Sequence, residues 1–199
     1  MNSTDTDKKL TTIYFIRHAE SDYSIRDGRL RPLTAKGLAD RRVVTEFLLN
    51  KGIDAVLSSP FRRAVETVAE FAGERGLEVE LVEDFRERRS DGDMWKDNID
   101  FNAFMERQWS DFNYKFSDGE CLAEVQDRNI AALNGVLERY RGKNIAIGTH
   151  GTALSTIINY YDRAYGFADF MAMVNKLPWA VRMSFDGDKF AGMEKIDLY

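Results

Sequence analysis

The sequence contains two histidines, and each follows a short β-rich, apolar segment. His18 comes after residues 12–16, and His150 comes after residues 144–148. A neutral imidazole is a competent nucleophile at neutral pH and can carry a covalent intermediate. A lone histidine is more often a surface or core residue than a catalytic one. Two histidines that each follow a β-rich segment, beside Arg, Thr or Gly, are more typical of a reactive pair.

Arginines near these histidines indicate phosphate chemistry. Arg17 precedes His18, and Arg62 and Arg63 fall in the first turn of a predicted helix. A phosphoryl group in transfer needs its oxygens held and its charge offset, and the planar guanidinium does both. Cations are unfavourable at a helix N-terminus, so this pair favours an anion site there. In isolation, a solvated basic pair would be the simpler interpretation.

A phosphate ester also needs a proton for its leaving oxygen. Glu87 comes shortly after the third β-rich segment, residues 79–82, and is the candidate general acid. Most acids in such a stretch are solvated, so the residues alone leave this choice open. The neighbouring acids are Glu83, Asp84, Asp91 and Asp93.

The elements that must position these residues alternate between β-rich runs and helical patterns. Strands are expected over 12–16, 54–57, 79–82 and 144–148. Residues 179–185 and 190–196 flank Asp186-Gly187-Asp188 and predict a hairpin. This alternation predicts an α/β fold with a largely parallel sheet, in which ligands bind beyond the carboxyl ends of the strands.

Helices are expected between the strands. Thr34 is the predicted N-cap of a helix that ends near Gly52. Ser59 is the predicted N-cap of the next helix, with Pro60 in its first position. The other helices are expected over 122–140 and 154–160.

Length and composition narrow the class of protein. A chain of 199 residues predicts one domain, with a disordered tail over 1–10. The formal net charge of −5 leaves no basic surplus for a nucleic-acid backbone. No apolar run approaches the ~18 residues that span a membrane, and the N-terminus lacks the apolar part of a secretory signal. The single cysteine, Cys121, favours a cytoplasmic protein.

Several motifs, taken together and in this order, resemble those of the histidine phosphatase superfamily, which includes cofactor-dependent phosphoglycerate mutases and many small phosphatases. They are Arg17-His18-Ala19-Glu20-Ser21, Leu33-Thr34-Ala35-Lys36-Gly37, Ser58-Ser59-Pro60-Phe61-Arg62-Arg63-Ala64-Val65-Glu66-Thr67, Phe85-Arg86-Glu87 and Thr149-His150-Gly151. The resemblance covers about residues 12–159 and is highly specific as a set. It implies a phosphoglycerate mutase-like fold, a three-layer α/β/α sandwich with a mostly parallel central sheet. It also implies one domain over 11–199, with a variable cap at about 88–120.

The resemblance also implies a role for each site residue. His18 is expected to be the phosphorylated nucleophile, and Arg63, rather than Arg62, is expected to hold the phosphoryl oxygens with Arg17. A protonated His150 would complete the pocket, and Glu87 would serve as general acid and then as base. No metal is expected. The expected substrate contacts are Arg17, Ser24, Arg63, Glu87, His150 and Gly151.

Some positions depart from the family pattern and leave the substrate open. Ser24 stands where relatives often carry Asn, and Cys121 replaces Ser in a G-G-E-S-like motif. The cap segment is rich in aromatic residues, which would either line a substrate pocket or pack on the core. These residues are Trp95, Phe101, Phe104, Trp109, Phe112, Tyr114 and Phe116.

The leading hypothesis is a metal-independent phosphomonoesterase that acts on a small phosphorylated metabolite. A phosphoglycerate mutase that depends on 2,3-bisphosphoglycerate is the main alternative, and no other cofactor is expected. A catalytically silent phospholigand-binding domain is a weaker alternative, since Arg17, His18, Arg63, Glu87 and His150 are all present. A metal hydrolase is also weaker, since neither histidine lies in a metal-ligand motif. Whether the protein forms a homodimer stays open.

Overall fold

The computed structural model describes residues 9–89 and 100–199. Most of the expected tail, Trp95 and the first part of the expected cap lie outside the described residues. The elements are β1 (Thr11–Arg17), α1 (Ala35–Leu49), β2 (Ala55–Ser58), α2 (Arg62–Arg75), β3 (Val79–Leu81), a 3₁₀ turn η1 (Glu83–Phe85), α3 (Phe101–Ser110), α4 (Leu122–Arg139), β4 (Asn144–Thr149), α5 (Gly151–Tyr161), α6 (Phe167–Val174), β5 (Trp179–Asp186) and β6 (Lys189–Ile196).

The strands form one sheet in the order β3-β2-β4-β1-β5-β6. Strands β3, β2, β4 and β1 run parallel to one another, whereas β5 is antiparallel to both β1 and β6. The expected hairpin is therefore confirmed, and Gly187 in its turn adopts a φ of 65°. Because the parallel strands all end at one edge of the sheet, the segments that follow β1, β2 and β4 gather there.

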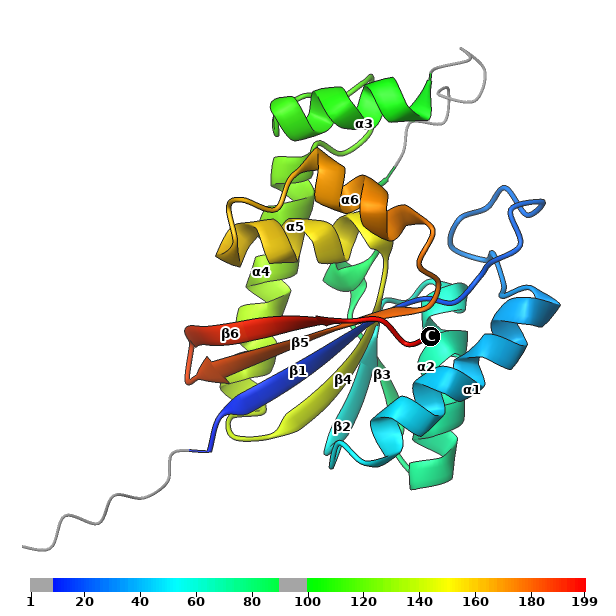
Figure 1. The fold of residues 1–199 in the computed structure, drawn as a ribbon, viewed down its shortest axis with the longest axis vertical. Coiled ribbons are helices and arrows are strands. Elements are labelled where there is room, and N and C mark those ends of the chain that lie inside the picture. Colours follow the sequence, from blue (N-terminus) through cyan, green and yellow to red (C-terminus); the bar gives the residue numbers. More distant parts are fainter. Residues whose placement is uncertain (1–8, 90–99) are drawn as a thin grey trace, which may run out of the picture.

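Helices cover both faces of the sheet (Figure 1). Along β1, Ile13 and Phe15 face the core shared with α4, α5 and α6, whereas Tyr14 and Ile16 face the core shared with α1 and α2. This alternation follows from the two-residue period of a strand. Burying each such apolar side chain stabilises the fold by roughly 1.5–3 kcal/mol. The expected three-layer α/β/α architecture is confirmed.

Thr34 caps α1 as expected. Its hydroxyl oxygen accepts a hydrogen bond from the Gly37 amide at 3.0 Å, and its own hydroxyl contacts the Glu20 carboxylate at 2.7 Å. A Cβ at Gly37 would lie 2.1 Å from the Glu20 carbonyl oxygen, so only glycine fits. The two motifs that contain these residues therefore fix the start of α1 against the chain just after His18.

The expected start of α2 is wrong. The helix begins at Arg62, with Phe61 as its N-cap, and not at Pro60. The Ser59 hydroxyl accepts from the Phe61 amide at 3.2 Å but also lies 2.7 Å from Nε2 of His150. Ser59 thus follows β2 and contacts His150, and α2 starts two residues later than expected.

The described part of the expected cap contains α3, a helix that the sequence pattern did not predict, and α6 was not predicted either. Helix α3 lies outermost, beyond α6 (Figure 1). The Trp109 ring centroid lies 5.8 Å from that of Phe170 on α6. Four of the aromatic residues belong to or pack against the main core, which supports the packing interpretation for them. They are Phe104, Trp109, Tyr114 and Phe116. No described helix is long and apolar enough to cross a membrane.

Candidate active site

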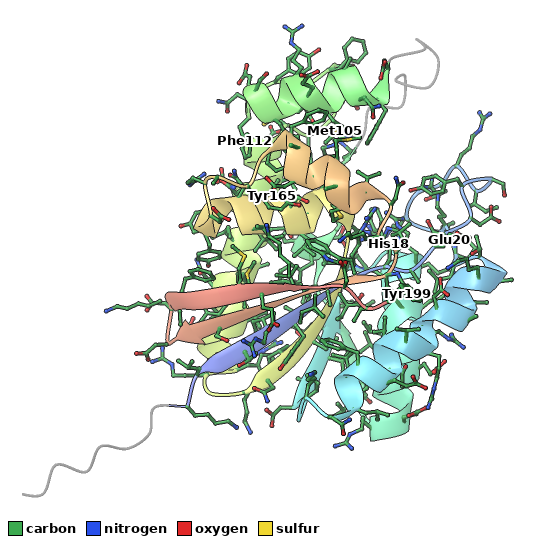
Figure 2. All side chains as sticks on the ribbon, in the orientation of Figure 1. His18, Glu20, Met105, Phe112, Tyr165 and Tyr199 are labelled. Atoms are coloured by element: carbon green, nitrogen blue, oxygen red, sulfur yellow. The ribbon has the colours of Figure 1, made fainter. Side chains whose placement is uncertain are left out.

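Two histidines meet at the carboxyl edge of the parallel strands. The ring centroids of His18, which follows β1, and His150, which follows β4, lie 5.4 Å apart. The His18 amide donates to the Thr149 carbonyl oxygen at 3.0 Å, which continues the β1–β4 ladder. Figure 2 shows His18 at this end of the sheet, with Glu20 nearby on the side of α1. The sequence prediction that the strand exits converge is confirmed.

His18 has the tautomer that a nucleophile needs. Its Nδ1 lies 2.7 Å from the Ala19 carbonyl oxygen, which can only accept, so Nδ1 carries the proton and the lone pair is on Nε2. The ring is 4% exposed. Burial, and then the charges of Arg63 and Arg17, lower the pKa of His18 well below its ordinary value. The imidazole is therefore neutral at neutral pH.

His150 is fully buried beside His18 and Phe61, with 5.1 Å between its ring centroid and that of Phe61. Nε2 contacts Ser59, and Nδ1 is buried without a partner among the described residues. Burial, and then the charge of Arg63, lower the pKa of His150 well below its ordinary value. The protein's own groups thus favour a neutral His150, so the expected protonated form requires the negative charge of a phosphoryl group.

Arg17 is held by the last turn of α6 and by the segment that joins α6 to β5. Its Nη1 donates to the carbonyl oxygens of Met173 at 2.6 Å and Lys176 at 3.1 Å. Its Nε is buried without a partner in the described chain, which leaves a donor for a phosphoryl oxygen. Burial lowers the pKa of Arg17 to about 10, with Glu87 acting in the opposite direction. The guanidinium therefore remains charged at neutral pH.

Arg62 and Arg63 differ in exposure and in their partners. The Arg62 side chain is 58% exposed and pairs with Glu66 one helical turn away at 2.7 Å. Arg63 is buried, and its Nη1 donates to the Gly28 carbonyl oxygen at 2.5 Å. Burial lowers the pKa of Arg63 to about 10. The preference for Arg63 as the residue in the pocket agrees with this placement.

Glu87 is attached to the start of α5. Its carboxylate accepts hydrogen bonds from the amides of Thr152 at 3.1 Å and Ala153 at 3.2 Å, and from the Arg88 amide at 2.7 Å. It also influences the pKa of both Arg17 and Arg63 through its charge. Because α5 begins directly after His150, this contact places the carboxylate at the same edge of the sheet as the two histidines.

Arg128 and Glu120 hold the backbone that carries Glu87. The Arg128 guanidinium, on α4, donates to the carbonyl oxygens of Asp84 at 2.7 Å and Arg86 at 2.8 Å. It also reaches the Glu87 carbonyl oxygen at 3.3 Å. Two parallel contacts of 3.0 and 3.1 Å join it to the Glu120 carboxylate. We did not identify Arg128 in the sequence, although Glu120 lies in the G-G-E-S-like motif.

The remaining expected contacts lie at the edge of the site. Ser24 is exposed in the loop after β1, and its amide donates to Asp22 at 2.9 Å, so a role in binding substrate stays a prediction. Gly151 packs against Arg17, since a Cβ there would lie 3.4 Å from Nε. The motif residue Thr67 accepts from the Ala19 amide at 3.0 Å and so holds the chain after His18. The described residues contain no group of three or more His, Cys, Asp or Glu side chains that could hold a metal ion.

The fold is an α/β/α sandwich with a mostly parallel sheet, and two histidines and two arginines lie together at the carboxyl edge of that sheet. This combination is typical of proteins that transfer phosphoryl groups through a histidine. Residues 13–190 match the family model described as histidine phosphatase superfamily, branch 1. The chain belongs to this superfamily, as the motifs suggested.

Relatives within the superfamily carry both phosphatase and mutase names. The probable phosphoglycerate mutase GpmB of Citrobacter koseri is 30% identical over 161 residues, which cover 74% of this chain and 73% of the relative. Phosphoserine phosphatase 1 of Hydrogenobacter thermophilus is 27% identical over 153 residues, which cover 71% of each chain.

Solved structures show the same fold. Bacillus stearothermophilus YhfR superposes with a TM-score of 0.76 at 25% identity, over 90% of this chain and 94% of the other. An Entamoeba histolytica phosphoserine phosphatase in complex with 3-phosphoglyceric acid gives 0.73 at 20% identity, over 94% and 98% of the two chains.

Proposed function

We propose that this protein is a metal-independent phosphomonoester hydrolase that works through a phosphohistidine on His18. The observation that carries the proposal is the state of His18, a buried neutral imidazole whose lone pair is on Nε2 and which lies in the field of Arg17 and Arg63. The names of relatives that act on phosphoserine support a small phosphorylated metabolite as substrate. The single cysteine is consistent with action in the cytoplasm.

In the first step, Nε2 of His18 attacks the phosphorus atom, and the bond from phosphorus to the leaving oxygen breaks. Arg17 and Arg63 offset the charge on the phosphoryl oxygens, and His150 adds a hydrogen-bond donor. Glu87 gives its proton to the leaving oxygen, which departs as an alcohol. The products of this step are phosphohistidine and a Glu87 carboxylate.

In the second step, the Glu87 carboxylate takes a proton from water as the water oxygen attacks phosphorus. The bond from phosphorus to Nε2 breaks, and its electron pair returns to His18. Inorganic phosphate leaves, and both residues regain their starting protonation. Neither step needs a metal ion or an organic cofactor.

A cofactor-dependent phosphoglycerate mutase is the second candidate, because the Citrobacter koseri relative carries that name. It would use the same His18 but pass the phosphoryl group to a phosphoglycerate and not to water. Its activity would depend on 2,3-bisphosphoglycerate. A silent binding domain is disfavoured, because His18 and Glu87 both remain in place at the site.

Hydrolysis of p-nitrophenyl phosphate in the presence of EDTA tests the proposal. The wild-type protein should be active, and His18→Ala should lose activity while keeping its thermal unfolding midpoint close to that of the wild type. Mass spectrometry after a rapid acid-free quench should find a phosphoryl group on His18. Loss of activity with EDTA, or full activity in His18→Ala, would overturn the proposal. Transfer that requires 2,3-bisphosphoglycerate would favour the mutase.

A further inference from the structure

Ser59 contacts both the start of α2 and the second histidine of the site. Its hydroxyl oxygen accepts a hydrogen bond from the Phe61 amide at 3.2 Å and lies 2.7 Å from Nε2 of His150. Ser59 and His150 are both 0% exposed, so bulk water does not supply partners for their polar atoms. The protons on these two side chains therefore follow from the contacts inside the protein.

The Ser59 hydroxyl has one proton to donate and two lone pairs that accept. The Phe61 amide uses one of the lone pairs. Among the described residues, the only acceptor for the hydroxyl proton in hydrogen-bond geometry is Nε2 of His150. The hydroxyl therefore donates to Nε2, and the neutral imidazole carries its own proton on Nδ1.

The two other proton arrangements leave more buried groups without partners. If Nε2 carried the proton and donated to Ser59, the hydroxyl proton would have no acceptor in the described chain. The lone pair would then lie on Nδ1 and would repel any phosphoryl oxygen beside it. A His150 imidazolium would leave the same hydroxyl proton without an acceptor. Unpaired polar groups in a buried position are unfavourable, so the contacts of Ser59 favour the Nδ1–H form.

The groups that face His150 from neighbouring elements oppose a positive charge on its ring. Burial lowers the pKa of His150 first, and the neighbouring cations and the second imidazole lower it further. These neighbours are Arg63 on α2, His18 after β1, Arg128 on α4 and Arg17 at the end of β1. The Glu87 carboxylate is bonded to the amides of Thr152 and Ala153 at the start of α5. The neutral ring therefore has to supply the hydrogen-bond donor.

Two buried donors lie at neighbouring strand ends. Nδ1 of His150 and Nε of Arg17 both lack a partner among the described residues. Arg17 is paired with Thr149 in the β1–β4 register, and His150 is the next residue of the chain. The His150 ring also lies beside the proposed nucleophile, with 5.4 Å between its centroid and that of His18. A phosphoryl group, which has several oxygens, can accept from both donors.

We propose that a neutral His150 donates from Nδ1 to a phosphoryl oxygen, and that Ser59 is the positioning residue that fixes this tautomer. The protonated His150 that the family resemblance implies is then not required. The donor stays available when the pH rises through the range in which an ordinary histidine loses its charge, about 6.5. This inference rests on the proposed phosphatase function and assigns the proton state of one of its residues.

Nitrogen NMR tests the proton assignment directly. The chain has two histidines, so His18→Asn retains His150 as its only one, provided that the protein carries no histidine tag. In isotope-labelled protein, the chemical shift distinguishes a protonated ring nitrogen from an unprotonated one. At neutral pH we expect a proton on Nδ1 and none on Nε2, both without ligand and with saturating inorganic phosphate. Adding Ser59→Ala should move the ring toward the Nε2–H form. A proton on Nε2 in His18→Asn, in either condition, would overturn the proposal.

Kinetics test whether this tautomer matters for the reaction. The measurement is kcat/KM for p-nitrophenyl phosphate at pH values from about 5.5 to 8. Without the Ser59 hydroxyl, Nδ1 obtains its proton mainly through the imidazolium, which forms at low pH. The ratio of Ser59→Ala to the wild type should therefore decrease as the pH rises, and the loss should reach about 3- to 30-fold at the upper end.

Two variants show whether this pH dependence belongs to the hydroxyl. Ser59→Thr keeps the hydroxyl, so its ratio to the wild type should stay constant with pH even if its activity is lower. Ser58→Ala is the matched control, because it removes a neighbouring buried hydroxyl that donates to the Ser59 carbonyl oxygen at 2.8 Å. Its ratio should also stay constant. A constant ratio in Ser59→Ala would mean that Ser59 has a purely structural role, and that result, or the same decrease in Ser58→Ala, would contradict the proposal.

The two sets of data separate this inference from the phosphatase function. If NMR finds the Nδ1–H form and the wild type hydrolyses no phosphate ester, the proton assignment stands and the phosphatase function fails. If the wild type hydrolyses p-nitrophenyl phosphate while Nε2 of His150 carries a proton, the phosphatase function stands and this inference fails.

Discussion

The proposed phosphate pocket, formed by Arg17, His18, Arg63 and His150, differs in burial and in its contacts from the rim around it, residues 21–34 and 100–120. In the pocket, His18 is 4% exposed and His150 is fully buried, and carbonyl or hydroxyl oxygens fix their rings. In the rim, Arg29 forms a surface ion pair with Glu83 of η1, and the two side chains are 51% and 55% exposed.

From this difference we infer that the buried residues carry out the reaction, whereas the exposed residues determine which ester is preferred. Buried groups with satisfied partners tolerate little change, because each lost contact leaves a polar atom without water. Exposed ion pairs contribute about 0–1 kcal/mol each and can be exchanged. Substitutions in the pocket should therefore abolish turnover of every ester, whereas substitutions in the rim should change which ester is preferred.

The largest effect is expected for Glu87→Gln, which keeps the shape of the side chain but cannot donate a proton. Turnover of an alkyl ester such as glycerol 3-phosphate should fall about 100- to 10,000-fold. Turnover of p-nitrophenyl phosphate should fall far less, because nitrophenolate leaves without a proton. The measurement is kcat on both esters. Glu83→Gln is the matched control from the same segment, and equal losses on both esters would contradict the acid role.

Arg63→Gln and Arg62→Gln compare the loss of a buried arginine with the loss of its exposed neighbour. Arg63→Gln should lower kcat/KM about 100- to 1,000-fold on every phosphate ester, because a buried charge that stabilises the transition state is lost. Arg62→Gln removes an exposed ion pair with Glu66 and should change kcat/KM less than about twofold. Steady-state kinetics on two esters provide the measurement. Similar losses in the two variants would show that net charge, and not the placement of Arg63, governs binding.

The buried histidines should make the fold sensitive to mild acid. The pKa values of His18 and His150 are lowered in the folded protein and return to about 6.5 on unfolding. As the pH falls below about 6.5, the unfolded state takes up protons that the folded state does not. The free energy of unfolding should thus fall with pH, by about 1.4 kcal/mol per histidine one pH unit below that value.

Urea denaturation at pH values from about 7.5 to 5.5 measures this loss, in a range above the titration of ordinary carboxylates. The double variant His18→Asn/His150→Asn serves as the comparison and should show a flatter pH dependence than the wild type. An identical slope in the two proteins would mean that these histidines do not titrate differently in the folded and unfolded states.

The smallest effect is expected for Arg128, on α4, which holds the backbone that carries Glu87. Arg128→Lys keeps the charge beside Glu120 but cannot bond all three carbonyl oxygens around Glu87. We expect kcat on alkyl esters to fall about tenfold and kcat on p-nitrophenyl phosphate to change less, since a misplaced acid matters only where the leaving oxygen needs a proton. Arg139→Gln, at the exposed end of the same helix, is the control. A loss that is the same for both esters would indicate a purely structural role.

The pocket could be predicted from the sequence because its chemistry restricts residue type. Few side chains can act as the nucleophile, and the two histidines each follow a strand whose direction the α/β pattern dictates. The pattern of strands and helices therefore suffices to predict that His18 and His150 lie together. The choice between Arg62 and Arg63 depended on the motif, and burial of Arg63 agrees with it.

The supports of the pocket could not be predicted in this way. The carbonyl oxygens of Met173 and Lys176 that hold Arg17 could come from any residue type, so the sequence carries no signal for them. Ser59 fits both an N-cap and a histidine partner, and the commoner role was the wrong one. Arg128 is one of many arginines, and only the path of the chain reveals that it faces the segment 84–87.

The position of β5 has a consequence for the synthesis of the protein. Trp179, at the start of β5, pairs with Arg17 at the end of β1, and the segment that leads into it supplies the oxygens that hold the Arg17 side chain. The residues proposed to react all lie before residue 152. A nascent chain from which all of these residues have left the ribosome still lacks β5, one of the two neighbours of β1. The growing polypeptide should therefore remain inactive on the ribosome until β5 has emerged, and translation must pass well beyond the last reactive residue before the first turnover.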